Sequence, residues 1–339
     1  LRLTHSFNKK MYHEGESLLN NLSFIQEQDL YTPGQDWVAT NKDNMFLALK
    51  VGAPITKMQY IQKSLLQYEK EWETGLTWRS WVDRQNYRSA GTLQYIHQDA
   101  TSGRSVLPDF NVAEIGMQFR FAPGERPYNS RRGKGSMVNL SKDAPIFKLS
   151  HQLGVQGLLG GDYAYNHTEF SVQKRIWLSS FGRLDAQLKM GKEWNKAPFP
   201  LLIIPNANQS LTIQPESFHL MNAMEFVADQ YVSFNATYYM KGLIMNRLPL
   251  IKWLRLREVF SFNMISGSLS TKNNPSLTPG LFQLPDGMRP LGKTPYMECS
   301  VGLDNIFNVL RIDYYRRLSY QNEPNINKSG FRVAFQFTF

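Results

Sequence analysis

The chain has 339 residues and a net charge of +10, with 13% aromatic and 19% charged residues. Its apolar and aromatic content is too high for a disordered protein. A disulfide scaffold is excluded, because Cys299 is the only cysteine. No run approaches the ~18 uncharged apolar residues that a membrane-spanning helix needs. A membrane β-barrel remains compatible with this composition, because alternate residues of each strand face a polar lumen.

The sequence opens at Leu1 without a secretory-signal pattern, so we expect a mature form or part of a longer protein. No internal repeat or linker divides residues 1–339, which predicts a single domain. The basic excess is typical of proteins that contact nucleic acid, anionic membranes or anions in a channel, or it lies in solvated loops. The basic loop 126–134 lacks a helix or sheet platform with interleaved aromatic residues, which nucleic-acid binding would need. We therefore expect contacts with lipid head groups, lipopolysaccharide or a partner, and no nucleic acid.

Apolar and polar residues alternate with a period of two along most of the chain, which indicates β-strands with one apolar face. Only 58–72 could also be read as a helix. The strongest alternation lies in the second half, where polar and apolar positions exchange at every residue. About sixteen segments qualify, in chain order 1–8, 18–28, 44–52, 57–72, 75–83, 88–98, 110–122, 143–152, 169–178, 183–190, 217–228, 232–241, 255–264, 297–304, 310–317 and 331–339.

These segments favour a transmembrane antiparallel β-barrel of about 16 strands over a soluble β-sandwich. Many reach the ten or so residues that a tilted spanning strand needs, whereas soluble strands average about five or six. Tyr and Trp prefer the membrane–water interface, and aromatic residues gather near the segment ends: Trp177, Phe181, Trp194, Phe199, Tyr231, Trp253 and Tyr320. A soluble adhesin remains the alternative, in which these residues fill an ordinary core.

The polar faces of the later segments carry charges of both signs, together with small and amide side chains. In a barrel these positions line the lumen, and opposite charges at close range form cross-strand ion pairs that stiffen it. The candidate lumen-lining residues are Glu169, Arg175, Arg183, Asp185, Lys189, Arg255, Arg257, Arg311, Asp313 and Arg317.

The connections differ in length, as in outer-membrane barrels with short turns on one side and long polar loops on the other. Tight turns are expected at Asp229 and at Asp304–Asn305, and long polar loops at 123–142 and 268–293. Three predicted strands separate the two tight turns, which places these turns on opposite sides. Either one strand is wrongly assigned or the rule fails in this chain.

The C-terminal residues match the insertion signal of bacterial outer-membrane barrels, which predicts recognition by the barrel-assembly machinery and an outer-membrane location. A terminal aromatic residue follows an alternating apolar face, and a glycine lies nine positions earlier. In a closed barrel this strand pairs with the first, near residues 1–8. The predicted signal comprises Gly330, Val333, Phe335, Phe337 and Phe339.

Catalytic signatures are absent from the sequence: it has no G-x-S-x-G, H-E-x-x-H, C-x-x-C or Walker A motif. No two histidines have metal-ligand spacing. His219 and Glu225 share a face of the predicted strand 217–228, but lie ~20 Å apart along it. We therefore expect no enzyme activity, cofactor or metal; an outer-membrane enzyme acting on lipid or glycan, with a site assembled across strands, remains an alternative.

Four stretches resemble an outer-membrane family of Bacteroidota whose function is not established: 198–210, 216–233, 240–259 and 295–320. Members of that family carry an N-terminal carboxypeptidase-regulatory-like domain before a C-terminal barrel, and only the barrel corresponds to this chain. The run from Ser300 to Leu318 also resembles late strands of the surface-antigen superfamily, which includes BamA, TamA and two-partner secretion transporters. Those sixteen-stranded barrels insert or export polypeptides.

One departure separates the chain from that superfamily. Its best-known motif is an Arg-Gly-aromatic tripeptide in a loop folded into the lumen, and the equivalent stretch, around Asn206–Ser210, has none. The only Arg-Gly pair, Arg132-Gly133, precedes a lysine in an early loop. The resemblance implies an outer-membrane barrel with a transport, protein-insertion or scaffold role and protein partners in the membrane. The missing tripeptide argues against a BamA-type mechanism.

Overall fold

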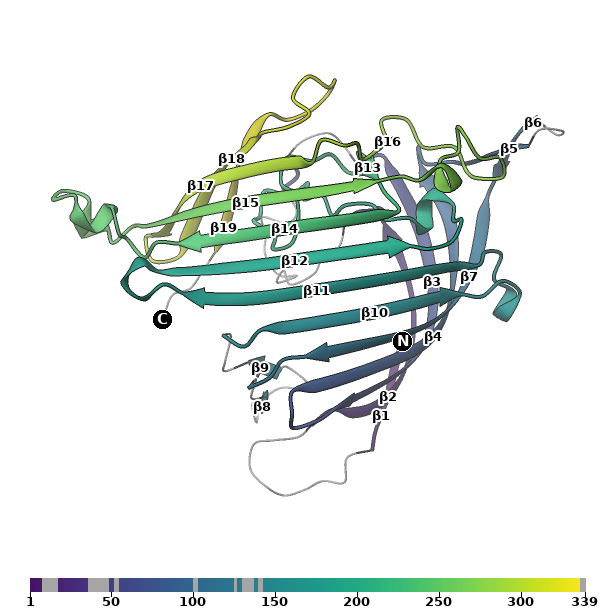
Figure 1. The fold of residues 1–339 in the computed structure, drawn as a ribbon, viewed down its shortest axis with the longest axis horizontal. Helices are drawn as coiled ribbons and strands as arrows, with labels where there is room; N and C mark the ends of the chain where they lie inside the picture. The colour runs from purple at the N-terminus through teal and green to yellow at the C-terminus, as the bar shows by residue number, and fades with distance from the viewer. Residues whose placement is uncertain are drawn as a thin grey trace.

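The computed structural model describes residues 1–7, 18–35, 49–51, 55–99, 103–124, 127–129, 137–139 and 143–335. A curved antiparallel sheet of 13 strands dominates it, and the sheet bends so that the early strands lie behind β10–β14 in Figure 1. Each strand pairs with the strands before and after it in this order: β1 (Arg2–Ser6), β2 (Asn20–Tyr31), β3 (Lys57–Glu71), β4 (Leu76–Gly91), β7 (Asp109–Phe121), β10 (Ile146–Gly154), β11 (Tyr165–Trp177), β12 (Arg183–Glu193), β14 (Gln230–Tyr239), β15 (Arg257–Ser268), β17 (Tyr296–Ile306), β18 (Leu310–Arg317) and β19 (Ser329–Phe335).

Three small sheets accompany the main one. Two are antiparallel hairpins, β5 (Tyr95–Asp99) with β6 (Gly103–Leu107) and β8 (Pro127–Asn129) with β9 (Met137–Asn139). The third joins β13 (Phe226–Val227) to β16 (Arg289–Pro290) in parallel. Helical structure in the described residues is limited to short 3₁₀ turns, and none of these helices is long and apolar enough to cross a membrane.

Thirteen of the sixteen predicted segments correspond to strands of the main sheet, including 58–72, which lies in β3. The predicted strand 88–98 is wrong. Its first residues belong to the end of β4, which runs to Gly91, and its last residues belong to β5, a short strand outside the main sheet. The predicted strand 217–228 is also wrong: apart from β13 it is irregular chain folded against the sheet. Segment 44–52 lies mostly outside the described residues, with a single bridge at Lys50.

The two faces of the sheet differ in chemistry, as the alternation predicts. One face, here called the outer face, exposes large apolar side chains, among them Met117, Phe119, Val232, Val301 and Phe331. The inner face buries polar and charged side chains at the alternate positions. For example, Glu298, Ser300 and Asp304 are buried on β17, and Arg311, Asp313 and Arg317 on β18.

The connections resolve the conflict over the two tight turns. Both predicted tight turns are misplaced. Asp229 ends the long connection between the neighbouring strands β12 and β14. Asp304 and Asn305 lie in β17, and the turn falls at 307–309, at the opposite end of the sheet from Asp229. At the end that carries the turn after β17, strands are also joined by tight turns at 72–75 and 178–182. The predicted long loops 123–142 and 268–293 lie at opposite ends, because an odd number of strands separates them, so not all long loops share one side.

The two edges of the sheet are β1 and β19, and the described residues show no pairing between them, contrary to the prediction. The free edge of β19 is instead occupied at Val333, whose N–H donates to Leu211 O at 2.9 Å and whose carbonyl accepts from Ile213 N–H at 2.8 Å. Of the predicted C-terminal signal, Phe337 and Phe339 lie outside the described residues.

Candidate functional site: the inward segment and its pocket

The connection between β12 and β14 folds back against the inner face of the sheet. We call residues 194–229 the inward segment. It pairs with itself through isolated bridges, Ile203 with Ala228 and Ala207 with Phe218. Polar side chains such as Asn208 and Gln209 are buried there and hydrogen-bonded to backbone carbonyls. Buried polar groups need such partners, so the segment has a defined conformation.

The carboxylate of Glu298, fully buried on β17, holds the middle of the inward segment. It accepts hydrogen bonds from the backbone N–H groups of His219 at 2.8 Å and Leu220 at 3.0 Å. The side chains of Asn263 on β15 and Tyr296 on β17 donate to the same carboxylate, each at 3.0 Å. Four donors on one buried carboxylate satisfy the oxygens that desolvation leaves without water.

A second buried anchor joins the segment to β18. The guanidinium of Arg317 donates to the Glu225 carboxylate at 2.6 and 3.1 Å and lies 4.8 Å from the Tyr296 ring centroid. Arg289, beside β13, donates to Glu225 at 2.8 Å. The bidentate contact between Arg317 and Glu225 is the strong form of a carboxylate–guanidinium pair.

The edge strand β19 provides the third contact. Arg332 points inward and donates to the carbonyl oxygen of His219, while Val333 forms the two backbone bonds described above. The inward segment also pairs with residues 49–51, where Val51 N–H donates to Gln209 O at 2.9 Å. The inward segment is thus bonded to β17, β18 and β19.

The His219 side chain lies inside this network. Its ring stacks on Tyr315, with centroids 4.2 Å apart, and its Nε2 accepts from Gln214 N–H at 3.3 Å. This arrangement leaves Nδ1, 3.4 Å from Glu298, to carry the ring hydrogen. Burial lowers the pKa of His219 below its ordinary value of 6.5, and the Glu298 carboxylate only partly opposes that effect.

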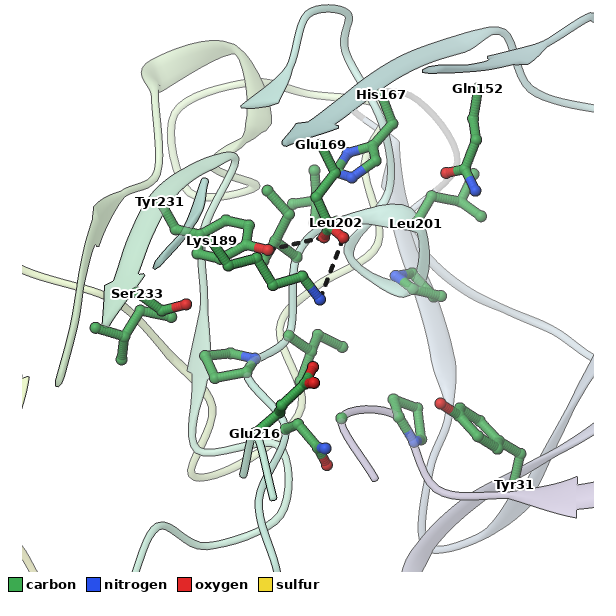
Figure 2. A pocket seen from close by; sticks show the side chains of 18 of the residues that line it. Tyr31, Gln152, His167, Glu169, Lys189, Leu201, Leu202, Glu216, Tyr231 and Ser233 are labelled. Atoms are coloured by element: carbon green, nitrogen blue, oxygen red, sulfur yellow. Dashed lines mark hydrogen bonds and ion pairs between the residues drawn. The ribbon is translucent and has the colours of Figure 1, made fainter. Parts of the chain in front are cut away.

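A cavity of about 330 Å³ lies between the inward segment and the inner face of the sheet (Figure 2). Lys189 on β12 and the hydroxyl of Tyr231 on β14 converge on the Glu169 carboxylate, at 3.2 and 2.8 Å. Glu216 projects into the same space from the inward segment. The cavity is lined by side chains of both charge signs on one side and by an apolar wall, residues 200–205, on another.

The other candidate lumen-lining residues also pair with one another on the inner face. Arg175 and Asp185, opposite each other on β11 and β12, form a bidentate pair at 2.6 and 2.8 Å. Arg183 lies 3.7 Å from Asp185 and over the Tyr239 ring. Arg311 and Asp313, two residues apart on β18, pair at 2.5 and 2.8 Å.

Arg257 begins β15, but Arg255 does not belong to this group. It lies in an exposed loop with a left-handed φ of 50°, where it ends a 3₁₀ turn before the strand begins. Two aromatic residues predicted for the membrane interface are also placed differently. Phe199 and Tyr231 are buried, in the inward segment and on the inner face, because both pack between the segment and the sheet.

Sequence reasoning did not identify the anchoring role of Glu225, Glu298 and Arg332. Their partners lie 79 to 113 residues away in sequence, so no local spacing connects them. The one signal in the sequence was that Glu298 and Arg332 are ionisable residues at positions predicted to lie on the inner face. The described residues contain no group of three His, Cys, Asp or Glu side chains that could hold a metal ion.

Solved structures with the same architecture include BamA from Haemophilus ducreyi lacking POTRA domains 1–3. It matches with a TM-score of 0.53 and 9% identity, over 99% of this chain and 61% of that one. At this identity the likeness shows the fold, a β-barrel of the BamA type, and this chain spans under two thirds of that protein. No curated protein matches the sequence. The C-terminal domain model of the family of unknown function DUF5686 matches residues 43–274, and the chain therefore belongs to this family.

Proposed function

We propose that the chain is an integral outer-membrane β-barrel whose lumen is closed by the inward segment, and that it serves protein insertion, assembly or scaffolding and not open diffusion. The observation that carries this proposal is the attachment of the inward segment to β17, β18 and β19 through buried charged groups. A pore that conducts solutes freely needs a continuous polar path. A segment held by the bonds to Glu298 and Arg317 obstructs such a path.

The outer face and the fold support the membrane location. Exposed side chains such as Phe119, Val301 and Phe331 form an apolar surface that lipid would cover. The resemblance to barrels that insert or export polypeptides favours a polypeptide substrate or partner over a small solute. The barrel-assembly machinery during insertion, lipopolysaccharide outside and other membrane proteins are the partners we propose.

Planar-bilayer conductance of the purified, reconstituted protein tests the closed lumen. We expect little steady conductance from the natural chain, and large, stable steps when residues 206–219 are replaced by a short Gly-Ser linker. The matched control shortens residues 275–280, in the connection between β15 and β17, and should leave conductance low. Equal conductance from the natural chain and the linker variant would contradict the proposal.

A polypeptide role is tested by site-specific photocrosslinking in cells from Val301, on the outer face, and Gln187, in the lumen. We expect crosslinks to other membrane proteins from the outer position. Assays for lipase and deacylase activity on the same preparation should give no turnover. Turnover that is lost on substitution of a cavity residue such as Glu169 would favour the enzyme alternative instead.

A further inference from the structure

The loop between β14 and β15 combines exposed apolar side chains with positive charge. We call residues 240–256 the rim loop; it projects beyond the strand ends at the far left of Figure 1. It contains four cations and no acidic residue. The cations are Lys241, Arg247, Lys252 and Arg255.

Hydrogen bonds to the strands fix the rim loop in place. The Glu258 carboxylate, buried at the start of β15, accepts from the N–H groups of Ile244, at 3.0 Å, and Met245. At the other end of the loop the Asn305 amide donates to Arg255 O at 2.8 Å. Two 3₁₀ turns, Met245–Arg247 and Lys252–Leu254, order the chain between these points.

The anchored loop holds its largest apolar side chains in the open. Leu250 is 88% exposed and Trp253 is 82% exposed. Exposed apolar side chains scattered singly are ordinary, but a contiguous group marks a surface that something else covers. Ile244, Leu248 and Leu254 add to the group, each exposed as well.

Neighbouring turns at the same end of the sheet extend this surface. Phe181, in the turn after β11, is exposed, and its carbonyl accepts from the Tyr238 hydroxyl at 2.6 Å. The Lys241 ammonium lies 4.5 Å from the centroid of the exposed Trp177 ring. Phe307, in the turn after β17, is 85% exposed. These exposed side chains lie at the same end of the sheet as the rim loop.

From this geometry we propose that the rim loop lies in the head-group boundary of the bilayer around the barrel and binds anionic phospholipid. This inference rests on the proposed membrane location. An amphipathic element with aromatic and leucine side chains on one side and cations on the other binds at this boundary. Anionic head groups complement the four cations, which have no carboxylate within the loop to neutralise them. Trp253 is the residue type that prefers that depth.

A single fluorescent label tests this placement in the full chain. The variant Cys299→Ser removes the only natural cysteine, and Leu250→Cys then carries an environment-sensitive nitrobenzoxadiazole probe. The protein is reconstituted in phosphatidylethanolamine vesicles with and without phosphatidylglycerol. We expect a blue-shifted probe, quenched by nitroxide placed high on the acyl chain and protected from iodide. Protection should fall at least twofold when phosphatidylglycerol is omitted, or when Arg247 and Lys252 become glutamate.

Two further label positions make the result decisive. Leu277 is 64% exposed on a loop at the opposite end of the sheet, and its probe should stay open to iodide. Val301 lies on the outer face of β17, and its probe should be quenched by nitroxide deep in the acyl chains. Failure at Val301 would refute the membrane barrel itself. Quenching at Val301 with free iodide access at Leu250 would overturn only the rim-loop proposal, as would protection at Leu250 without nitroxide quenching, which would indicate a protein partner.

Discussion

Arg317 is fully buried and yet charged, so its surroundings decide whether the inward segment stays in place. Taking two charges out of water has a large desolvation cost, and their attraction offsets it only when the geometry is good. The bidentate contact with Glu225 and the nearby Tyr296 ring meet that condition. The pair therefore specifies where the segment lies more than it adds net stability.

Replacing Arg317 with methionine should lower the free energy of unfolding by about 3 kcal/mol, because the Glu225 carboxylate stays buried with Arg289 as its one remaining charged partner among the bonds described and the Asn222 N–H as a neutral donor. Adding Glu225→Gln should restore part of that loss. Urea titrations in detergent micelles measure both values. Arg316→Met, at an exposed position on the same strand, is the control. A loss no larger than that of the control would show that the buried pair does not hold the segment.

His219 predicts a pH dependence of stability. Burial lowers its pKa in the folded protein, so between that value and the ordinary 6.5 the unfolded chain binds more protons than the folded one. Stability should then be full above about pH 6.5 and fall on acidification, by no more than about 1.4 kcal/mol per pH unit for one proton. Unfolding titrations from pH 8 to pH 5 should show a smaller slope for His219→Gln; an unchanged slope would assign the dependence to other groups.

At the scale of the strand, an added charge should destabilise the protein much more on the outer face of β12 and β14 than on their inner face. Leu188 pairs with Phe234 on the outer face, and Gln187 pairs with Asn235 on the inner face. Arginine at Leu188 or Phe234 should destabilise the protein by about 2–4 kcal/mol near the bilayer midplane. Arginine at Gln187 or Asn235 should cost much less. Folding titrations into lipid vesicles measure the difference, and equal costs would refute the assignment of the faces.

The last strand should also control insertion. Deleting Phe339, or changing Phe337 and Phe339 to serine, should lower outer-membrane levels and leave a protease-sensitive periplasmic species, because these residues end the insertion signal that the sequence predicts. Cell fractionation with quantitative blotting compares each variant with the natural chain. Normal accumulation of the Phe339-deleted chain in the outer membrane would show that the signal lies elsewhere.

Alternation predicted most of the sheet because the strands have two chemically different sides over their whole length. The same rule failed at 217–228, where the inward segment also alternates: Phe218 packs into an apolar cluster while the His219 backbone reaches Glu298. A buried irregular chain in polar surroundings imitates a strand. The distinction depends on contacts with residues about 80 positions away, which no local pattern contains.

The candidate site was less predictable than the sheet. Glu169, Lys189, Arg175 and Asp185 could be placed on the inner side from their period alone, and the structure pairs them. The predicted lining role remains a prediction. Arg255 misled the pattern because a left-handed residue interrupts the alternation just before the strand begins.

For the whole molecule, a continuous hydrogen-bonded sheet of 13 strands in lipid predicts resistance to unfolding. The chain should be extracted only with detergent and should migrate faster on gels before boiling than after, because backbone groups in lipid have no alternative partner. Semi-native electrophoresis of the membrane fraction shows this directly. Recovery of a soluble monomer from the detergent-free fraction would favour the sandwich alternative.

The bonds between Val333 and residues 211–213 constrain the order in which the chain can fold. Protein chains do not thread through closed loops, so the inward segment must settle against the inner face, including β17 and β18, before the final strand arrives. That strand then meets a template with two sides, β18 and the stretch 211–213. A slip of one residue would turn Arg332 outward and Val333 inward and break both sets of bonds at once. The inward segment thereby helps to set the register of β19. If the inward segment is misplaced, β19 should fail to pair and assembly should stop before this last strand is added.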